Sequence, residues 1–263
     1  MALRIALGIE YDGAGFHGWQ SQPHGNTLQD ALERALAEVA GESVRLTCAG
    51  RTDAGVHALG QVAHFDSGVE RPDNAWVRGT NAHLPDAVAV RWAQPVDEEF
   101  HARFAALSRS YRYVLYNHPV RPALNHSHVG WCHRLLDVER MQQGARLLLG
   151  EQDFSTFRSA ECQAKSPLKV VHQADVARRG DMIVFDFRAS AFLHHMVRNI
   201  VGALVAVGSG KQAPAWIGEL ISRRDRTLAA ATFSPAGLYF AGVEYAPHWR
   251  LPVEGRIIGP FAG

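Results

Sequence analysis

Residues 50–57, GRTDAGVH, place an arginine, an aspartate and a histidine in one short stretch with two glycines. The stretch lies between two strand-like segments, which predicts a loop. Glycines let such a loop turn tightly and approach a ligand closely. A carboxylate aimed from a tight turn, here Asp53, can act as a nucleophile. The alternative is an Asx-turn, in which Asp53 only accepts hydrogen bonds from neighbouring backbone N–H groups.

A second candidate lies in the apolar segment 192–207, which we predict to be a largely buried helix because apolar residues surround its axis. His194 and Arg198 are four residues apart and would share one face of that helix. A guanidinium group stays charged in proteins, so burying it requires an anionic partner. Two interpretations follow: a structural ion pair, or an arginine that holds a catalytic aspartate.

The glycines Gly13, Gly15 and Gly18 match the pattern GxGxxG directly after a strand-like segment. In a dinucleotide-binding fold a helix begins at these glycines and holds the pyrophosphate at its N-terminus. Here the next helix is expected only from residue 27. We therefore predict a flexible glycine loop, and a nucleotide-dependent enzyme remains as an alternative.

Cysteine and histidine spacing indicates neither disulfides nor a metal. The three cysteines form an odd, well-spread set, and the 14 histidines include no HExxH pattern. We therefore expect the protein to reside in a reducing compartment. The N-terminal residues show no signal-peptide cleavage pattern, and segment 192–207 is shorter than the ~20 apolar residues of a membrane span. The sequence therefore predicts a soluble, cytoplasmic protein that does not associate with a membrane.

The charge is divided unevenly along the 263 residues, although the total is only +1. Residues 1–100 contain 7 arginines and 14 acidic residues, a formal charge of −7, whereas residues 101–263 carry +8. Of the 27 basic residues only Lys165, Lys169 and Lys211 are lysines. Guanidinium groups bind phosphates in a bidentate manner, so the positive half suits a polyanionic partner. Codon usage that favours arginine is the alternative.

Hydrophobic periodicity predicts two α/β units. In the first half we expect strands at 3–10, 45–48, 61–65 and 88–92, a helix capped by Asn26 with Gln29 as its capping-box partner and stopped by Gly41, and a helix at 74–82. In the second half we expect strands at 111–116, 170–177, 182–188 and 238–245, a helix capped by Asp137, and helices at 192–207 and 214–222. The corresponding boundaries are 1–105 for the first domain, 106–136 for a connecting segment, 137–246 for the second domain and 247–263 for a tail.

Four segments carry a family resemblance: YDGAGFHGWQSQP, GRTDAGVHALGQVAHFD, FHARFAALSRSYRYVLYNH and HHMVRNIVGALVAVG. In this order they resemble the TruA family of tRNA pseudouridine synthases from about residue 8 to residue 245. The resemblance implies an α+β fold of two RRM-like (ferredoxin-like) α/β domains. It further implies that their mixed and antiparallel sheets join, with a positively charged cleft between the domains. One departure is His17, where the family more usually has an aromatic residue such as tyrosine.

The resemblance also implies an activity. The family enzymes are homodimers that isomerise uridine to pseudouridine at nucleotides 38, 39 and 40 of the tRNA anticodon stem-loop, without a cofactor or metal. The alternative from another functional class is a catalytically silent tRNA-binding module that uses the same cleft.

Site residues are implied by position in the matching segments. Asp53 stands at the catalytic aspartate and Arg198 at the arginine that pairs with it. Tyr111 stands at the tyrosine that stacks on the target base. Arg51 matches the basic residue that helps to evert the base, and Leu238 matches an apolar residue of the pocket.

Overall fold

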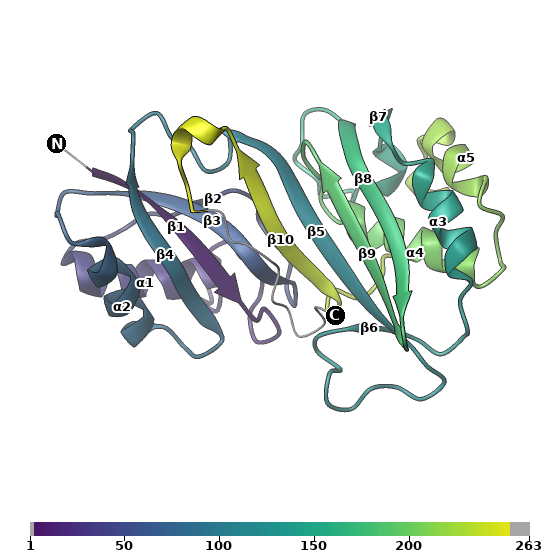
Figure 1. The fold of residues 1–263 in the computed structure, drawn as a ribbon, viewed down its shortest axis with the longest axis horizontal. Helices are drawn as coiled ribbons and strands as arrows, with labels where there is room; N and C mark the ends of the chain where they lie inside the picture. Colours follow the sequence, from purple (N-terminus) through teal and green to yellow (C-terminus); the bar gives the residue numbers. More distant parts are fainter. Residues whose placement is uncertain (1–2, 253–263) are drawn as a thin grey trace. The chain divides into compact units, whose positions relative to one another are not determined.

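The computed structural model describes residues 3–252, which form an α+β protein with mixed, mostly antiparallel strands (Figure 1). Two compact units divide these residues. The first comprises the chain up to Leu107 together with the segment from Phe240 onward, and the second comprises Ser108–Tyr239. The first unit is therefore built from two separate stretches of the chain.

The first unit has a sheet with helices on one face (Figure 1). Its strands follow the order β4-β1-β3-β10, and the short strand β2 pairs with β3. Residues 240–245 of β10 belong to this unit. The elements are β1 (Leu3–Tyr11), α1 (Leu28–Ala40), β2 (Thr47–Cys48), β3 (His57–Ser67), α2 (Asp73–His83), β4 (Val88–Val96), β10 (Leu238–Tyr245) and the 3₁₀ turn η3 (Pro247–Trp249).

Helix α1 shows how the apolar spacing positions an element. Its buried side chains recur every three or four residues, as in Leu28, Leu32 and Leu36, so one face packs on the sheet. The helix ends where Gly41 adopts φ 73°, a conformation that favours glycine. The predicted cap at Asn26 is wrong by one residue: Thr27 is the N-cap and accepts a hydrogen bond from the backbone N–H of residue 30.

The second unit places its helices on one side of a sheet ordered β5-β9-β8-β7, and the short strand β6 runs parallel to β5 (Figure 1). Strand β6 lies within the segment 106–136, which the sequence predicts to connect the two domains. The elements are β5 (Ala106–Asn117), β6 (Gly130–Cys132), α3 (Val138–Arg146), β7 (Gly150–Asp153), η1 (Ser155–Phe157), β8 (Leu168–Arg179), β9 (Met182–Ala189), α4 (Met196–Gly208), α5 (Trp216–Arg223) and η2 (Arg226–Leu228).

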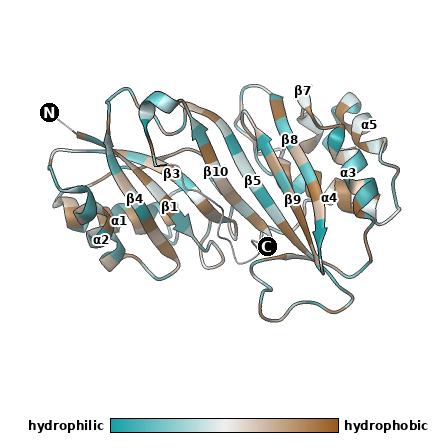
Figure 2. Cartoon of the chain, in the orientation of Figure 1, coloured by the Kyte–Doolittle hydropathy of each residue, from teal (hydrophilic) through white to brown (hydrophobic). Residues whose placement is uncertain are grey.

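Strands β5 and β9 form the centre of the second core. Tyr111 pairs with Phe187 and Tyr113 with Phe185, so these aromatic side chains lie on the same face of the sheet. Tyr113 and Phe185 are fully buried. Figure 2 shows hydrophobic residues along much of β9 and β10.

Helix α4 is largely buried, as its composition predicts, but it begins later than residue 192. His195 precedes the first turn with φ 63°, a left-handed conformation that a helix cannot continue. His194 therefore lies before the helix, and the expectation that it shares a helical face with Arg198 is wrong.

Two further expectations from the sequence concern the cysteines and membrane-spanning helices. Cys48, Cys132 and Cys162 are all free thiols, in agreement with the odd, scattered cysteine set. Within residues 3–252, no helix combines the length and apolar character that a bilayer span requires. The expected tail at 247–263 begins with η3, and its residues 253–263 lie outside the described part of the chain.

Candidate functional site

Asp53 lies on a loop of the first unit, residues 49–56, which we call the Asp53 loop. The loop connects β2 to β3, as the sequence predicts. Its tight turn is closed by the N–H of Val56, which donates to the carbonyl oxygen of Asp53 over 3.2 Å, while Gly55 adopts φ 75°. Asp53 is half-buried and Arg51 is exposed.

A second loop packs its glycines against the Asp53 loop. The N–H of Trp19 donates to the carbonyl oxygen of Thr52 over 3.0 Å. A Cβ atom on Gly18 would lie 2.8 Å from that oxygen, and one on Gly13 would overlap the carbonyl oxygen of Val56. The glycines that match GxGxxG therefore allow two backbones to approach each other closely. The flexible loop expected from the sequence is a packed support, and α1 begins ten residues after Gly18.

Buried polar side chains hold the Asp53 loop from the sheet. The hydroxyl groups of Thr52 and Tyr11 lie 2.8 Å apart, and Gln61 donates through Nε2 to the carbonyl oxygen of Gly50 over 2.7 Å. Burial raises the pKa of Tyr11, so its hydroxyl stays protonated. Satisfied polar contacts of this kind fix one loop conformation, because breaking them in a buried place is costly.

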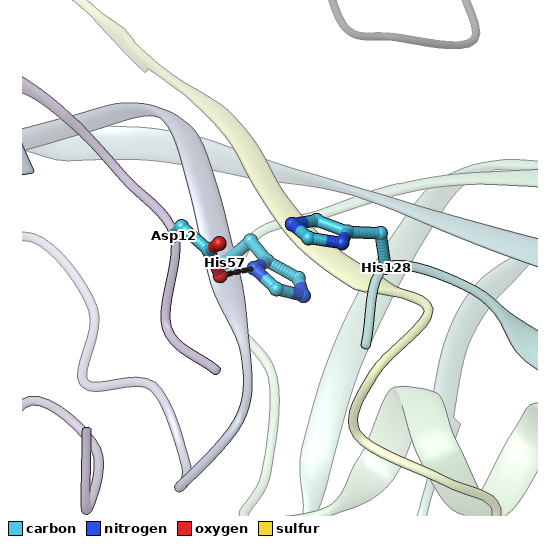
Figure 3. Close-up of side chains that lie close together, drawn as sticks. All are labelled: Asp12, His57 and His128. Carbon is cyan, nitrogen blue, oxygen red and sulfur yellow. Dashed lines mark ion pairs between the residues drawn. The ribbon is translucent and has the colours of Figure 1, made fainter. Parts of the chain in front are cut away.

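His57, the first residue of β3, follows the Asp53 loop and contacts the other loop through one ring nitrogen. Its Nδ1 lies 3.0 Å from Oδ1 of Asp12 (Figure 3) and 3.1 Å from the backbone nitrogen of Gly13. With a proton on Nδ1 the ring donates to Asp12, and without it the ring accepts from the N–H of Gly13. The ring is 1% exposed. His128, also drawn in Figure 3, belongs to the second unit.

Arg198 lies in the first turn of α4 in the second unit and is half-buried. Its Nε donates to the carbonyl oxygen of Phe233 over 2.9 Å, and the N–H of Phe233 donates back to the carbonyl oxygen of Arg198 over 3.2 Å. This reciprocal pair fixes the guanidinium by one edge. Phe233 belongs to residues 229–237, which lie between η2 and β10 and which we call the strap.

The strap is attached to α4 by a buried polar network. Asn199, which is fully buried, accepts through Oδ1 from Nη2 of Arg226 at 3.1 Å and from the hydroxyl of Thr232 at 2.7 Å. One turn further along α4, a Cβ atom on Gly202 would overlap the carbonyl oxygen of Ala231. The strap therefore follows the first turns of the helix at backbone distance.

The other end of the strap is attached to the sheet of the second unit. Tyr113 donates through its hydroxyl to the carbonyl oxygen of Ser234 over 2.9 Å, and the N–H of Val114 donates to that of Gly237 over 2.8 Å. Burial raises the pKa of Tyr113, which keeps the hydroxyl a donor. Leu238 follows directly as the first residue of β10 and is 5% exposed.

Tyr111 lies on β5, two residues before Tyr113 and on the same face of the strand. Its ring meets Phe192 edge to face, with centroids 4.9 Å apart and planes at 79°. The side chain is half-buried, so part of the ring reaches solvent. A half-exposed aromatic ring of fixed orientation is suited to stacking on a base.

The structure distributes the candidate residues between the units. Asp53 and Arg51 belong to the first unit, whereas Tyr111, Arg198 and Leu238 belong to the second. Within the second unit the strap connects Arg198 to Leu238. Sequence reasoning did not identify the strap or Asn199, although an asparagine among the apolar residues of α4 was a signal for a buried polar contact.

Comparison with known proteins identifies the relatives of the chain. The family model described as tRNA pseudouridine synthase matches residues 8–105 and 145–246. A tRNA pseudouridine synthase A of Dechloromonas aromatica is 64% identical over 250 residues, which cover 95% of each chain. The protein of that name from Aromatoleum aromaticum is 60% identical over 256 residues, covering 97% of each, and that from Burkholderia thailandensis is 59% identical over 250 residues, covering 95% of this chain and 93% of its own.

Proposed function

This chain belongs to the TruA family of tRNA pseudouridine synthases, which are isomerases, and from this membership we propose that Asp53 is its nucleophile. The segment that carries Asp53 lies inside the matched region 8–105. The observation that supports the proposal most directly is the way the structure holds this residue, on a turn that backbone and side-chain hydrogen bonds fix from two directions. A nucleophile held in one orientation loses little entropy in reaching its target.

The reaction exchanges one bond to the base for another. The N1–C1′ bond of uridine breaks, the uracil turns, and C5 bonds to C1′. The proton on C5 is lost and N1 gains one, so substrate and product are isomers. A carboxylate can attack C1′, add to C6 of uracil, or assist formation of a glycal, and Asp53 serves as the reactive group on each route.

Arg198 is proposed to pair with Asp53 and to stabilise its ionised form. Because its Nε donates to the carbonyl oxygen of Phe233, its Nη groups are the ones that would donate hydrogen bonds to the carboxylate of Asp53. Tyr111 is proposed to stack on the detached uracil and to accept the C5 proton through its hydroxyl, and Leu238 to form an apolar wall of the pocket. These pairings require the two units to form one cleft, which the family resemblance implies.

The proposed substrate site is the anticodon stem-loop of tRNA, at nucleotides 38, 39 and 40. A paired base must leave the helix to reach a carboxylate, at a cost of a few kcal/mol. Arg51, exposed on the Asp53 loop, is proposed to help evert the base. Phosphate contacts from the positively charged second half would offset the cost and make binding weaken as salt increases. The resemblance further implies a homodimer. Sedimentation of the free enzyme tests this, because it measures the mass of the particle in solution.

The test uses tRNA tritiated at C5 of uracil, since isomerisation releases that tritium to water. Asp53→Asn should reduce tritium release by roughly 10⁴-fold while tRNA affinity stays within about threefold, because only the nucleophile is removed. Asp86→Asn, which changes an exposed aspartate of the same unit in the same way, should release tritium at the wild-type rate. Full activity of Asp53→Asn would refute the assignment.

The same assay decides the alternative function. A catalytically silent tRNA-binding module would bind tRNA with the same salt dependence but would release no tritium, whichever residue is changed. Transcripts that keep a single uridine at 38, 39 or 40 then show which of the three positions the enzyme accepts.

A further inference from the structure

The turn between β4 and β5 holds an aromatic side chain on the surface of the first unit. Phe100 is fully buried, and Arg4 donates to the backbone carbonyl groups of Glu98 and Phe100. One residue on, His101 accepts through Nδ1 from the backbone N–H groups of residues 103 and 104, each over 3.2 Å. These hydrogen bonds fix the backbone of the turn, and its outer side is exposed to solvent at residues 103 and 104.

Phe104 lies on that outer side and is 76% exposed. Its ring stacks on His101, with centroids 4.2 Å apart and planes at 30°. The guanidinium carbon of Arg103 lies 5.6 Å from the centre of the same ring. A ring that is supported by a second ring and a cation and is otherwise open to solvent can receive the face of a planar group.

The chemistry of this cluster favours a nucleobase over an apolar protein surface. Bases stack on aromatic rings and on guanidinium planes, and a cation beside the ring is placed to meet the phosphate of the same nucleotide. Burial and the charge of Arg4 lower the pKa of His101, so the ring beneath Phe104 is neutral at pH 7. A purely apolar partner would gain nothing from a charged arginine at the contact.

The turn that carries Phe104 lies beside β2, from which the Asp53 loop departs. The N–H of Ala102 donates to Nδ1 of His64 over 3.1 Å, and the ring of His64 lies against that of His101, with centroids 4.9 Å apart. His64 in turn lies on β3 and pairs with Thr47 of β2. The exposed ring and Arg51 belong to one unit, so their relation is independent of any movement between units.

We propose that Phe104 and Arg103 form a stacking site for a base of the tRNA next to the target nucleotide. Phe104 receives the face of the base, and Arg103 receives the adjoining phosphate. This inference rests on the proposed function for its ligand, a nucleotide of tRNA. It adds a positioning role, because a stacked neighbouring base would hold the RNA strand in place while the target base leaves the RNA helix.

The test measures the Kd for tRNA in an Asp53→Asn background, so that binding is read without turnover. Phe104→Leu keeps an apolar side chain but removes the ring, and we expect the Kd to rise about 10-fold, the effect typical of losing one base–aromatic stack. Phe104→Trp should restore the Kd to within about twofold. Arg103→Gln should reduce the dependence of log Kd on log salt by about one phosphate contact.

Leu107→Ala is the matched control, because Leu107 is the neighbouring exposed apolar residue of the same unit, at 54%. It should leave the Kd unchanged. Wild-type affinity of Phe104→Leu, or an equal loss in Leu107→Ala, would overturn the proposal, as would a change in sedimentation of Phe104→Leu without a change in Kd. Tritium release by Asp53→Asn would refute the nucleophile assignment alone, since the Phe104 comparison concerns binding.

Discussion

The Asp53 loop and the start of α4 hold their candidate residues by different means. Around Asp53 two irregular loops approach so closely that glycine is required at Gly13 and Gly18. Around Arg198 the support is a regular helix, and a strap is attached to it by the side chains of Asn199, Arg226 and Thr232. Close approach at glycines predominates in the first region, whereas in the second a close approach at Gly202 is combined with this side-chain network.

The difference has a consequence for how each region responds to change. A loop held by close backbone contacts is displaced when one methyl group is added, because backbone atoms cannot rotate out of the way. A strap held by several hydrogen bonds is loosened when one donor is removed, while the helix beneath it persists. An added methyl group should therefore displace the loops that meet at Gly13 and Gly18, and removal of the Thr232 hydroxyl should loosen the strap.

The largest effect is expected from adding a methyl group at Gly18. Gly18→Ala combines φ 86° with a Cβ 2.8 Å from the carbonyl oxygen of Thr52, and we expect it to lower the free energy of unfolding by about 2–4 kcal/mol. Gly15→Ala is the control, because a Cβ there meets no atom within 4 Å. Urea denaturation of both variants measures the difference. Equal stability of the two would contradict the close-approach explanation.

A smaller effect is expected from releasing the strap. Thr232→Val removes the hydroxyl that donates to Asn199, and we expect kcat to fall roughly fivefold because Arg198 loses its fixed orientation, with a loss of about 1 kcal/mol in stability. Thr232→Ser should restore both values. In an Arg198→Met background, which itself lowers kcat, Thr232→Val should cause no additional loss of kcat. An additive loss would show that the strap does not act through Arg198.

The smallest effect concerns pH and lies outside both regions. Burial, with the neighbouring charges of His101 and Arg4, lowers the pKa of His64 to about 4. In the unfolded chain a histidine titrates near 6.5, so between pH 6.5 and pH 4 the unfolded state binds more protons. Stability should therefore be constant above pH 6.5 and decline as the pH falls toward 4. Thermal unfolding of His64→Gln should show a flatter decline in stability over that pH interval. An unchanged profile would mean that other groups cause the decline.

Local patterns predicted the elements whose determinants lie close together in the sequence. The apolar spacing of α1, the cap at Asp137 and the strand β10 all appear as expected. The position of Asp53 on a loop between strands also followed from its two flanking glycines and adjoining strand patterns. These features depend on a few consecutive residues, and their energetics are largely local.

Contacts between distant segments were not predictable in this way. The spacing of Gly13 and Gly18 gave no sign that they meet Thr52 and Val56 some forty residues away. The start of α4 was misplaced because a left-handed histidine, His195, interrupts an apolar pattern that is otherwise helical. In both cases the determinant is a backbone conformation set by tertiary packing, which side-chain periodicity does not report.

The strap constrains which mutations the second unit can accept. Six of its residues contact the rest of the unit through their carbonyl oxygens, namely 230, 231, 233, 234, 235 and 237. Every amino acid has that oxygen, so replacing Ala231 or Ser234 leaves the contact in place. Inserting or deleting one residue would instead shift every later oxygen away from its partner. Apart from Thr232, whose hydroxyl donates to Asn199, and Gly237, where a Cβ atom would overlap the carbonyl oxygen of Val114, the strap should thus tolerate changes of residue type while its length stays constant. A library of single substitutions and single-residue deletions across 229–237 would reveal this pattern.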